Sequence, residues 1–187
     1  MKHFLAVLIS SCLLLTSAVF AAQLSEQESD DLLYMTEEEK LAHDVYLAFQ
    51  RKYRDRVFPN IRRSEQRHMD AMAGLLQRYG LDNPSQSEPG EFTNPELQEL
   101  YDDLIKRGSS SRIEAIKVGA LIEEKDMIDI VEAIAGTDES ASKRVYSNLL
   151  EGSKNHLRAF VSRLDRLGVE YSPVMLEPAE YAAIVGN

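Results

Sequence analysis

The stretch Ser64-Glu65-Gln66-Arg67-His68 places a carboxylate and an imidazole three residues apart. On a helix that spacing brings both side chains to one face, one turn from each other. Apolar residues share the stripe on which they fall: Ile61, Met72, Leu75 and Tyr79. Ionisable groups in an apolar stripe are costly to bury unless something pairs with them, and a metal ion is one such partner. Because Glu-x-x-His alone is a weak motif, a surface glutamate with a half-buried histidine is the alternative unless other helices supply matching ligands.

Composition indicates an all-α protein with a substantial core. The chain has 187 residues, no Trp, 9 Gly and 6 Pro, and strand-like alternation is scarce. This length suits one domain. The formal net charge of −10 and a pI of about 4.9 argue against nucleic acid or an anionic membrane surface as a partner.

The N-terminal segment is predicted to be a secretory signal peptide. Lys2 and His3 precede an apolar run over residues 4–15, and Val19-Phe20-Ala21 offers small-residue cleavage chemistry. We therefore expect residues 1–21, or 1–22, to be removed, leaving a single domain over 22–187. No later apolar run is long enough to cross a membrane. The mature protein is accordingly expected in a bacterial periplasm or outside the cell.

An alternative for this segment is a lipid anchor at Cys12. Ile9-Ser10-Ser11-Cys12 resembles a lipobox, but few apolar residues precede the cysteine and the apolar run continues after it. If the segment is instead a cleaved signal peptide, the only cysteine is lost with it. The mature protein would then have no disulfide and no thiolate ligand.

Apolar periodicity and capping signals predict four long helices. Ser25 and Glu28 form a capping box that opens the first helix, which runs to about Arg51 or Tyr53. The other long helices are expected over 61–79, 110–135 and 138–167. About thirty residues connect the second to the third, a long connection for a bundle, and they contain a short helix over 96–106. A further short helix is expected over 178–185.

Each long helix carries an ionisable group within its apolar seam. Besides Glu65 with His68, these are Glu39 on the first helix, Glu123 or Glu124 on the third, and His156 on the fourth. The periodicity does not decide between Glu123 and Glu124, and Asp126 is placed to assist. Several uncompensated charges in one core would cost many kcal/mol, so we expect them to share a cation. Carboxylates with neutral imidazoles suit iron, manganese or zinc.

The order of these residues resembles the rubrerythrin branch of the ferritin-like superfamily. Four segments more closely resemble an uncharacterised, often secreted, prokaryotic family known only as a domain of unknown function: residues 37–42, 64–71, 121–124 and 152–160. The resemblance covers nearly all of the expected mature chain. It implies a ferritin-like four-helix bundle whose second and third helices are joined by a long crossover carrying a short extra helix. It implies metal binding but no settled activity.

The sequence departs from the di-iron members of that superfamily at Ser153. Those members carry Glu-x-x-His on the fourth helix as well, whereas Ser153 stands three residues before His156. The site is therefore interpreted as an asymmetric dinuclear centre, a single-metal site, or a site adapted to another metal. There is also no Cys-x-x-Cys rubredoxin module, so the usual rubrerythrin electron supply is absent.

Three smaller features complete the prediction. Methionines stand four residues from the expected ligands and either fill the core or form a layer that would take copper(I): Met35, Met72 and Met127. His43 is an extra candidate ligand that fits the helix flank better. Tyr46, two turns from Glu39, is a candidate electron donor or hydrogen-bond partner.

Three hypotheses for function remain open on the sequence. The first is redox chemistry, in which dioxygen or peroxide is reduced while bound metal is oxidised. The metal would be one or two iron ions, or manganese. Its expected ligands are Glu39, Glu65, His68, Glu123 (or Glu124) and His156. The second is non-catalytic buffering of iron, copper or zinc. The third is a structural bundle with a metal-free polar core. A homodimer is compatible with each.

Overall fold

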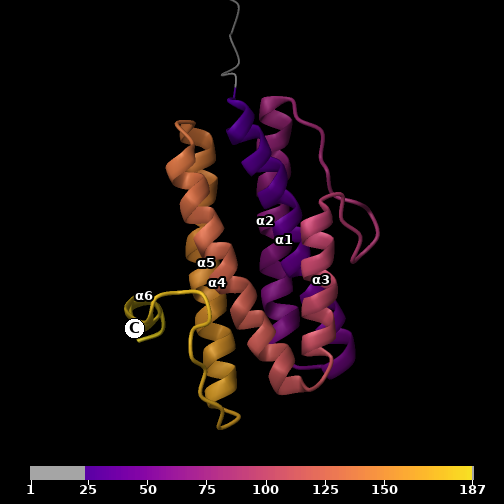
Figure 1. Ribbon diagram of the computed structural model, residues 1–187, viewed down its shortest axis with the longest axis vertical. Coiled ribbons are helices and arrows are strands. Elements are labelled where there is room, and N and C mark those ends of the chain that lie inside the picture. Colours follow the sequence, from indigo (N-terminus) through magenta and orange to yellow (C-terminus); the bar gives the residue numbers. More distant parts are fainter. Residues whose placement is uncertain (1–23, 187) are drawn as a thin grey trace, which may run out of the picture.

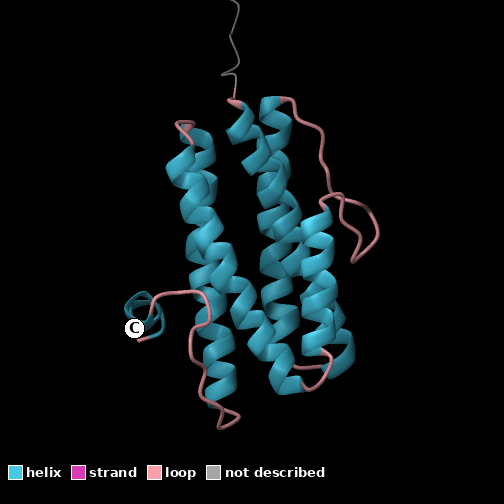
Figure 2. Ribbon diagram, in the orientation of Figure 1, coloured by secondary structure: helices cyan, strands magenta, loops and turns pink. Residues whose placement is uncertain are grey.

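The computed structural model describes residues 24–186, which form six helices and no strand (Figure 2). These helices are α1 (Glu26–Tyr53), α2 (Val57–Tyr79), α3 (Pro95–Gly108), α4 (Arg112–Gly136), α5 (Ser140–Asp165) and α6 (Pro178–Val185). The all-α prediction is confirmed for this part of the chain. The signal peptide and lipobox predictions concern residues that lie outside it.

The four long helices lie side by side along the long axis of the molecule (Figure 1). α1 packs on α2 and on α4, and α5 packs on α4 and on α2. Residues 54–56 join α1 to α2 and residues 137–139 join α4 to α5, so each pair runs antiparallel. The predicted long connection from α2 to α4 is present and contains α3, which packs on α1 and α4. The ferritin-like classification of this arrangement stays a prediction.

Local sequence explains where three of the six described helices begin. Ser25 and Glu28 form the predicted capping box, in which the side chain of each residue accepts a hydrogen bond from the backbone amide of the other. The Asn94 side chain caps α3, and Ser111 caps α4 by accepting a hydrogen bond from the Glu114 amide. These caps satisfy amides that a helix start leaves without partners.

Two predicted boundaries differ from the structure. α2 begins at Val57 rather than at about residue 61, so Pro59 lies in its first turn, where a missing N–H costs no helical hydrogen bond. α5 begins after Glu139, which makes no side-chain cap, and it ends at Asp165 rather than at about residue 167. Both errors displace only the ends of helices and leave the apolar seams in register.

The core consists of two apolar clusters. One contains an aromatic group in which Tyr46, Phe49, Phe58 and Phe160 contact one another. The other is built mainly from aliphatic residues and methionines: Leu32, Met35, Met72, Leu75, Leu76 and Ile130, together with Ala133, Tyr146 and Leu149. Along each long helix, the expected metal ligands fall between residues of the two clusters, so the candidate site is a polar layer within an apolar core.

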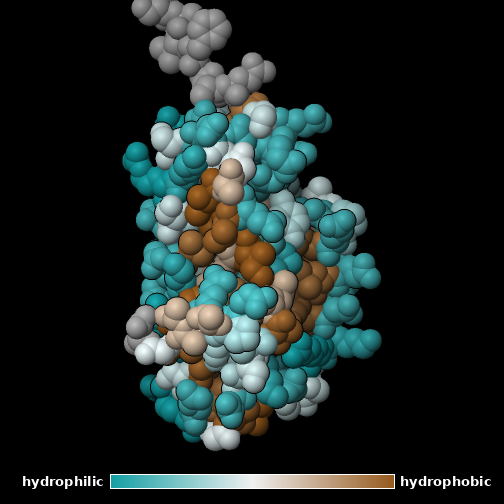
Figure 3. All heavy atoms as spheres, turned by 60° about the vertical axis from the view of Figure 1, so that its left-hand side comes forward, coloured by the Kyte–Doolittle hydropathy of each residue, from teal (hydrophilic) through white to brown (hydrophobic). Residues whose placement is uncertain are grey.

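The surface is largely hydrophilic, with an apolar strip down the face shown in Figure 3. The large apolar side chains that are most exposed in the described part of the chain are Val131, Val174 and Met175. None of the helices in residues 24–186 combines the length and apolarity required to span a bilayer. The proposed homodimer stays a prediction.

Candidate metal centre

Glu65 lies at the centre of the polar layer, between two imidazoles. Its Oε2 is 2.9 Å from His68 Nδ1, and its Oε1 is 2.9 Å from His156 Nδ1. All three residues are buried, with exposed fractions of 2 %, 8 % and 6 % for Glu65, His68 and His156. The two rings stack with their centroids 5.4 Å apart. One carboxylate therefore faces a different histidine with each of its oxygens.

Each imidazole also faces a second carboxylate. His68 Nδ1 is hydrogen-bonded to Glu39 Oε2 at 3.1 Å, and His156 Nδ1 lies 3.3 Å from Glu123 Oε2. Because Glu39 comes from α1 and Glu123 from α4, all four long helices contribute to the cluster. The result is two adjoining sets of donors, Glu39–His68–Glu65 and Glu65–His156–Glu123, which share the Glu65 carboxylate.

Several donor atoms in this cluster converge without satisfying one another. Glu39 Oε1, Glu65 Oε1 and His156 Nδ1 are buried and have no hydrogen-bond partner, because the short contact between Glu65 and His156 lacks hydrogen-bond geometry. Buried polar atoms without partners are rare and costly in proteins. Atoms of Glu65, His68 and His156 also lie within 4.8 Å of one another, close enough to hold one ion. The donor set thus fits a metal.

The charges in the cluster favour cations strongly. Burial alone would lower the pKa of His68, but hydrogen bonds and charges from Glu39 and Glu65 raise it to about 11. Burial would likewise lower the pKa of His156, and the charges of Glu123 and Glu65 raise it to about 10. Without metal, both imidazoles therefore hold protons at neutral pH. These protons neutralise charge that metal ions would otherwise neutralise.

The pKa values of the three carboxylates shift in different directions. Burial raises the pKa of Glu39 to about 7 and also raises that of Glu123. Burial would raise the pKa of Glu65 too, but the charge of His156 and the close contacts with both imidazoles lower it to about 2. Glu65 is consequently the carboxylate that stays ionised between the two histidines.

Tyr46 fixes the orientation of Glu123. Its hydroxyl donates a hydrogen bond to Glu123 Oε1 at 2.6 Å. Burial, and then the charges of Glu123 and Glu65, raise the pKa of Tyr46 well above that of free tyrosine. The phenol therefore stays protonated and acts as a donor to the cluster, one of the two roles expected from the sequence.

Asp126 brings a fourth carboxylate beside the cluster at the position where α5 carries Ser153. The Ser153 hydroxyl donates a short hydrogen bond to Asp126 Oδ2, while Asp126 Oδ1 is buried without a partner. Burial, and then the charges of Glu39 and Glu38, raise the pKa of Asp126 well above its usual value. The small Ser153 side chain thus accommodates a carboxylate from α4, where the resemblance implies one from α5.

Glu124 lies apart from the cluster. Its carboxylate accepts hydrogen bonds from the Tyr171 hydroxyl at 2.6 Å and from the amides of Val174, Met175 and Leu176 at 2.7 to 2.9 Å. It holds the C-terminal segment against α4. Of the two candidates that the sequence leaves open, only Glu123 approaches a histidine of the cluster.

The flanking candidates also have partners elsewhere. His43 contacts Asp44 Oδ1 at 2.9 Å and Arg62 Nη1 at 3.2 Å, so it sits on the helix flank as expected. The methionines do not form one layer, because Met35 and Met72 belong to one apolar cluster and Met127 to the other.

Gly152 is a site residue that sequence reasoning missed. A Cβ at this position of α5 would lie 2.5 Å from His68 Nε2 and 2.7 Å from His68 Cε1. Glycine therefore makes room for the imidazole between α2 and α5. The only sequence signal for this role is that Gly152 directly precedes Ser153. Helical periodicity gives no reason to expect a glycine at this position.

Replacing Gly152 by alanine is expected to displace the His68 ring and to weaken metal binding by at least about tenfold. Gly74→Ala on α2 is the matched control, because a Cβ there meets nothing within 4 Å. The control should keep its metal and gain about 0.5–1 kcal/mol of stability from helix propensity. Competition with a chelator measures the affinity, and equal affinities for the two variants would contradict this role for Gly152.

Comparison with known proteins places the chain in a family. Residues 28–187 match a family described as "Uncharacterized protein domain (DUF2202)". The chain belongs to the DUF2202 family. All six residues of the predicted ligand set fall within the match. This confirms the expected membership of an uncharacterised family, while the ferritin-like relationship stays a prediction.

A relative of this DUF2202 chain is known from an archaeon. The chain is 44 % identical over 165 residues to "Uncharacterized protein MJ0754" of Methanocaldococcus jannaschii, covering 88 % of this chain and 89 % of the relative. A solved structure, "Crystal structure of hypothetical protein MJ0754 from Methanococcus jannaschii DSM 2661", matches with a TM-score of 0.86. That match covers 88 % of this chain and 94 % of the other, at 44 % identity. The DUF2202 chain is thus similar in fold to an experimentally determined structure.

Proposed function

We propose that this DUF2202 protein binds two metal ions, iron or manganese, side by side in its core, with Glu65 bridging them. The observation that carries the proposal is the position of Glu65, whose two oxygens each face a different imidazole at 2.9 Å. Each imidazole also faces a second carboxylate, so the donors divide into two sets that share Glu65. Glu39 and His68 would complete the first site, and Glu123 and His156 the second.

The choice of metal rests on the ligand atoms. Carboxylate oxygens and imidazole nitrogens suit iron, manganese and zinc, whereas copper(I) prefers sulfur. The three methionine sulfurs are divided between two apolar clusters, which removes the argument for copper. Glu124 is not a ligand in this proposal, because the C-terminal segment supplies its hydrogen bonds.

We further propose that the centre serves the oxidation of ferrous ion by dioxygen or peroxide, in a ferritin-like bundle outside the cytoplasm. Bound iron would supply the one-electron chemistry with the oxidant. The chain itself holds the ligands buried, keeps Glu65 ionised, and orients Glu123 through the Tyr46 hydroxyl. The location rests on the signal peptide predicted over residues 1–21.

The rival is a protein that holds a metal, or a metal-free polar core, without catalysis. It is favoured by one observation, the hydrogen bond between His68 and Glu39, which partly compensates both groups in the absence of metal. The two functions differ in their response to ferrous ion and an oxidant.

Oxygen uptake after addition of ferrous ion to metal-free protein tests the redox function. We expect uptake in proportion to the protein, faster than for ferrous ion alone, and unchanged in Glu151→Gln, since Glu151 is exposed on α5. His68→Ala should remove the acceleration. Stoichiometric iron binding without acceleration by dioxygen or hydrogen peroxide would contradict the redox function and favour a metal store.

A further inference from the structure

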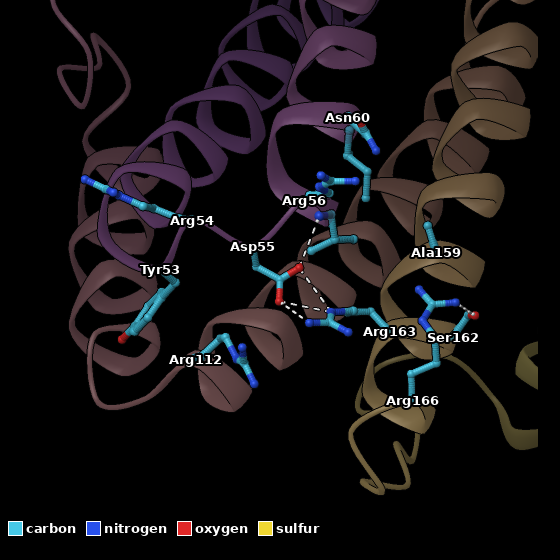
Figure 4. A pocket seen from close by; sticks show the side chains of 12 residues that line it. Tyr53, Arg54, Asp55, Arg56, Asn60, Arg112, Ala159, Ser162, Arg163 and Arg166 are labelled. Atoms are coloured by element: carbon cyan, nitrogen blue, oxygen red, sulfur yellow. Dashed lines mark hydrogen bonds and ion pairs between the residues drawn. The ribbon is translucent and has the colours of Figure 1, made fainter.

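A cavity of about 590 Å³ lies where α1 ends, α2 and α4 begin, and α5 ends (Figure 4). Its volume falls in the range of small-molecule sites. Its nearest lining residues, Ile61 and Ala159, lie about one helical turn from Glu65 and His156, and none of the proposed metal ligands lines it. The cavity therefore adjoins the proposed metal centre without including its ligands.

The cavity is strongly basic in a chain of net charge −10. Its lining includes five arginines and one carboxylate: Arg54, Arg56, Arg112, Arg163, Arg166 and Asp55. Asp55 is already occupied, because both of its oxygens accept hydrogen bonds from Arg163 at 2.8 to 3.1 Å and Oδ1 also accepts from the Val57 amide. The lining contains no other carboxylate that could neutralise the remaining four arginines.

Two of these arginines lie where a positive charge is unfavourable. Arg56 is the N-cap of α2 and Arg112 is the first residue of α4, and the N-terminal end of a helix carries partial positive charge. The start of α2 has neither an acidic residue in its first turn nor a side-chain cap. Within residues 24–186, the Arg56 side chain makes no ion pair or hydrogen bond, and Arg112 reaches Asp55 only through its longer-range charge.

The side chains differ in how they lie around the opening. In Figure 4, Arg163 points at Asp55, Arg56 lies beside Asn60, and Arg54 extends away from the other arginines. Arg166 donates a hydrogen bond to the Ser162 hydroxyl at 2.8 Å on the α5 side. Apolar side chains complete the wall: Val57, Ile61 and Ala159. The cavity thus combines unneutralised guanidinium groups with an apolar surface.

We propose that this cavity binds a small oxyanion with at least two negative charges, such as a phosphate compound or a polycarboxylate. Guanidinium groups bind both through paired, charge-assisted hydrogen bonds. An anion here would neutralise Arg56 and Arg112, and it would receive the favourable field of the α2 N-terminus. The apolar wall would contact the organic part of the ligand.

Calorimetric titration of the full-length mature protein with inorganic phosphate, pyrophosphate and citrate tests the proposal. Saturable 1:1 binding of pyrophosphate or citrate is expected, at least about tenfold tighter than phosphate and weakened by added salt. Tighter binding of pyrophosphate would identify phosphate compounds as the ligand class, and tighter binding of citrate would identify polycarboxylates.

The double variant Arg56→Gln/Arg112→Gln should weaken binding by about 100-fold, roughly tenfold for each arginine. Both residues are exposed and hold no carboxylate, so the fold and the metal content should be unchanged. Arg144→Gln is the matched control, because Arg144 is exposed on α5 and does not line the cavity, and it should bind within about twofold of the native protein. Equal binding by the double variant, or no saturable binding of any of the three anions, would overturn the proposal even if the metal centre is correct. Binding only to a large polyanion such as heparin would overturn it as well.

Discussion

Replacing Glu65 by glutamine is expected to remove both metal ions, whereas Glu39→Gln should remove only one. The reason is the shared carboxylate, since Glu65 faces both His68 and His156 while Glu39 faces only His68. An amide keeps the size of the side chain but loses the charge and one of its two ligand oxygens. Loss of a ligand should cost at least about 100-fold in affinity, because even supporting residues of metal sites cost 10- to 100-fold.

Metal-to-protein ratios after reconstitution and desalting measure this difference. Glu151→Gln, an exposed substitution on α5, serves as the control and should retain both ions. Circular dichroism should show that each variant keeps its helices. Loss of one ion in both Glu39→Gln and Glu65→Gln would contradict the bridging position of Glu65.

Replacing Glu124 by alanine is expected to release the C-terminal segment and to destabilise the protein by about 3 kcal/mol or more. The buried carboxylate accepts hydrogen bonds from the Tyr171 hydroxyl and three successive backbone amides, and alanine leaves these donors without a partner. Urea unfolding measures the loss of stability. Limited proteolysis should show faster cleavage between residues 171 and 186.

Glu132→Ala is the matched control on α4, because Glu132 is exposed and forms no such contacts. It should change stability by less than about 0.5 kcal/mol. Glu124→Gln should fall between the two, because an amide oxygen accepts some of the same hydrogen bonds. Both Glu124 variants should keep their full metal content. Loss of metal from Glu124→Ala with the C-terminal segment still protected would contradict the assignment of Glu123 rather than Glu124 to the centre.

Helical periodicity predicts the positions that come together in the core but not what covers the outside of a helix. Glu39, Glu65, Glu123 and His156 could be found because each interrupts an apolar seam. Periodicity could not choose between Glu123 and Glu124, since both are buried. Glu124 faces a C-terminal segment whose path depends on tertiary packing.

The run Glu37-Glu38-Glu39 illustrates the same limit. Three consecutive glutamates are typical of a solvated helix surface, yet all three are buried. Glu37 accepts hydrogen bonds from the amides of Thr93 and Asn94 in the long connection, and Glu38 pairs with Lys125 at 2.6 Å. These partners lie far away in the sequence, so no local pattern could predict them.

Elemental analysis of the mature protein, purified without an affinity tag, tests the central claim most directly. The account predicts two ions per chain, iron or manganese, either in the purified protein or after reconstitution. A stoichiometry of one would contradict the bridging carboxylate. No stoichiometric metal after reconstitution would contradict the metal centre itself and leave the Glu and His side chains as a hydrogen-bonded polar core.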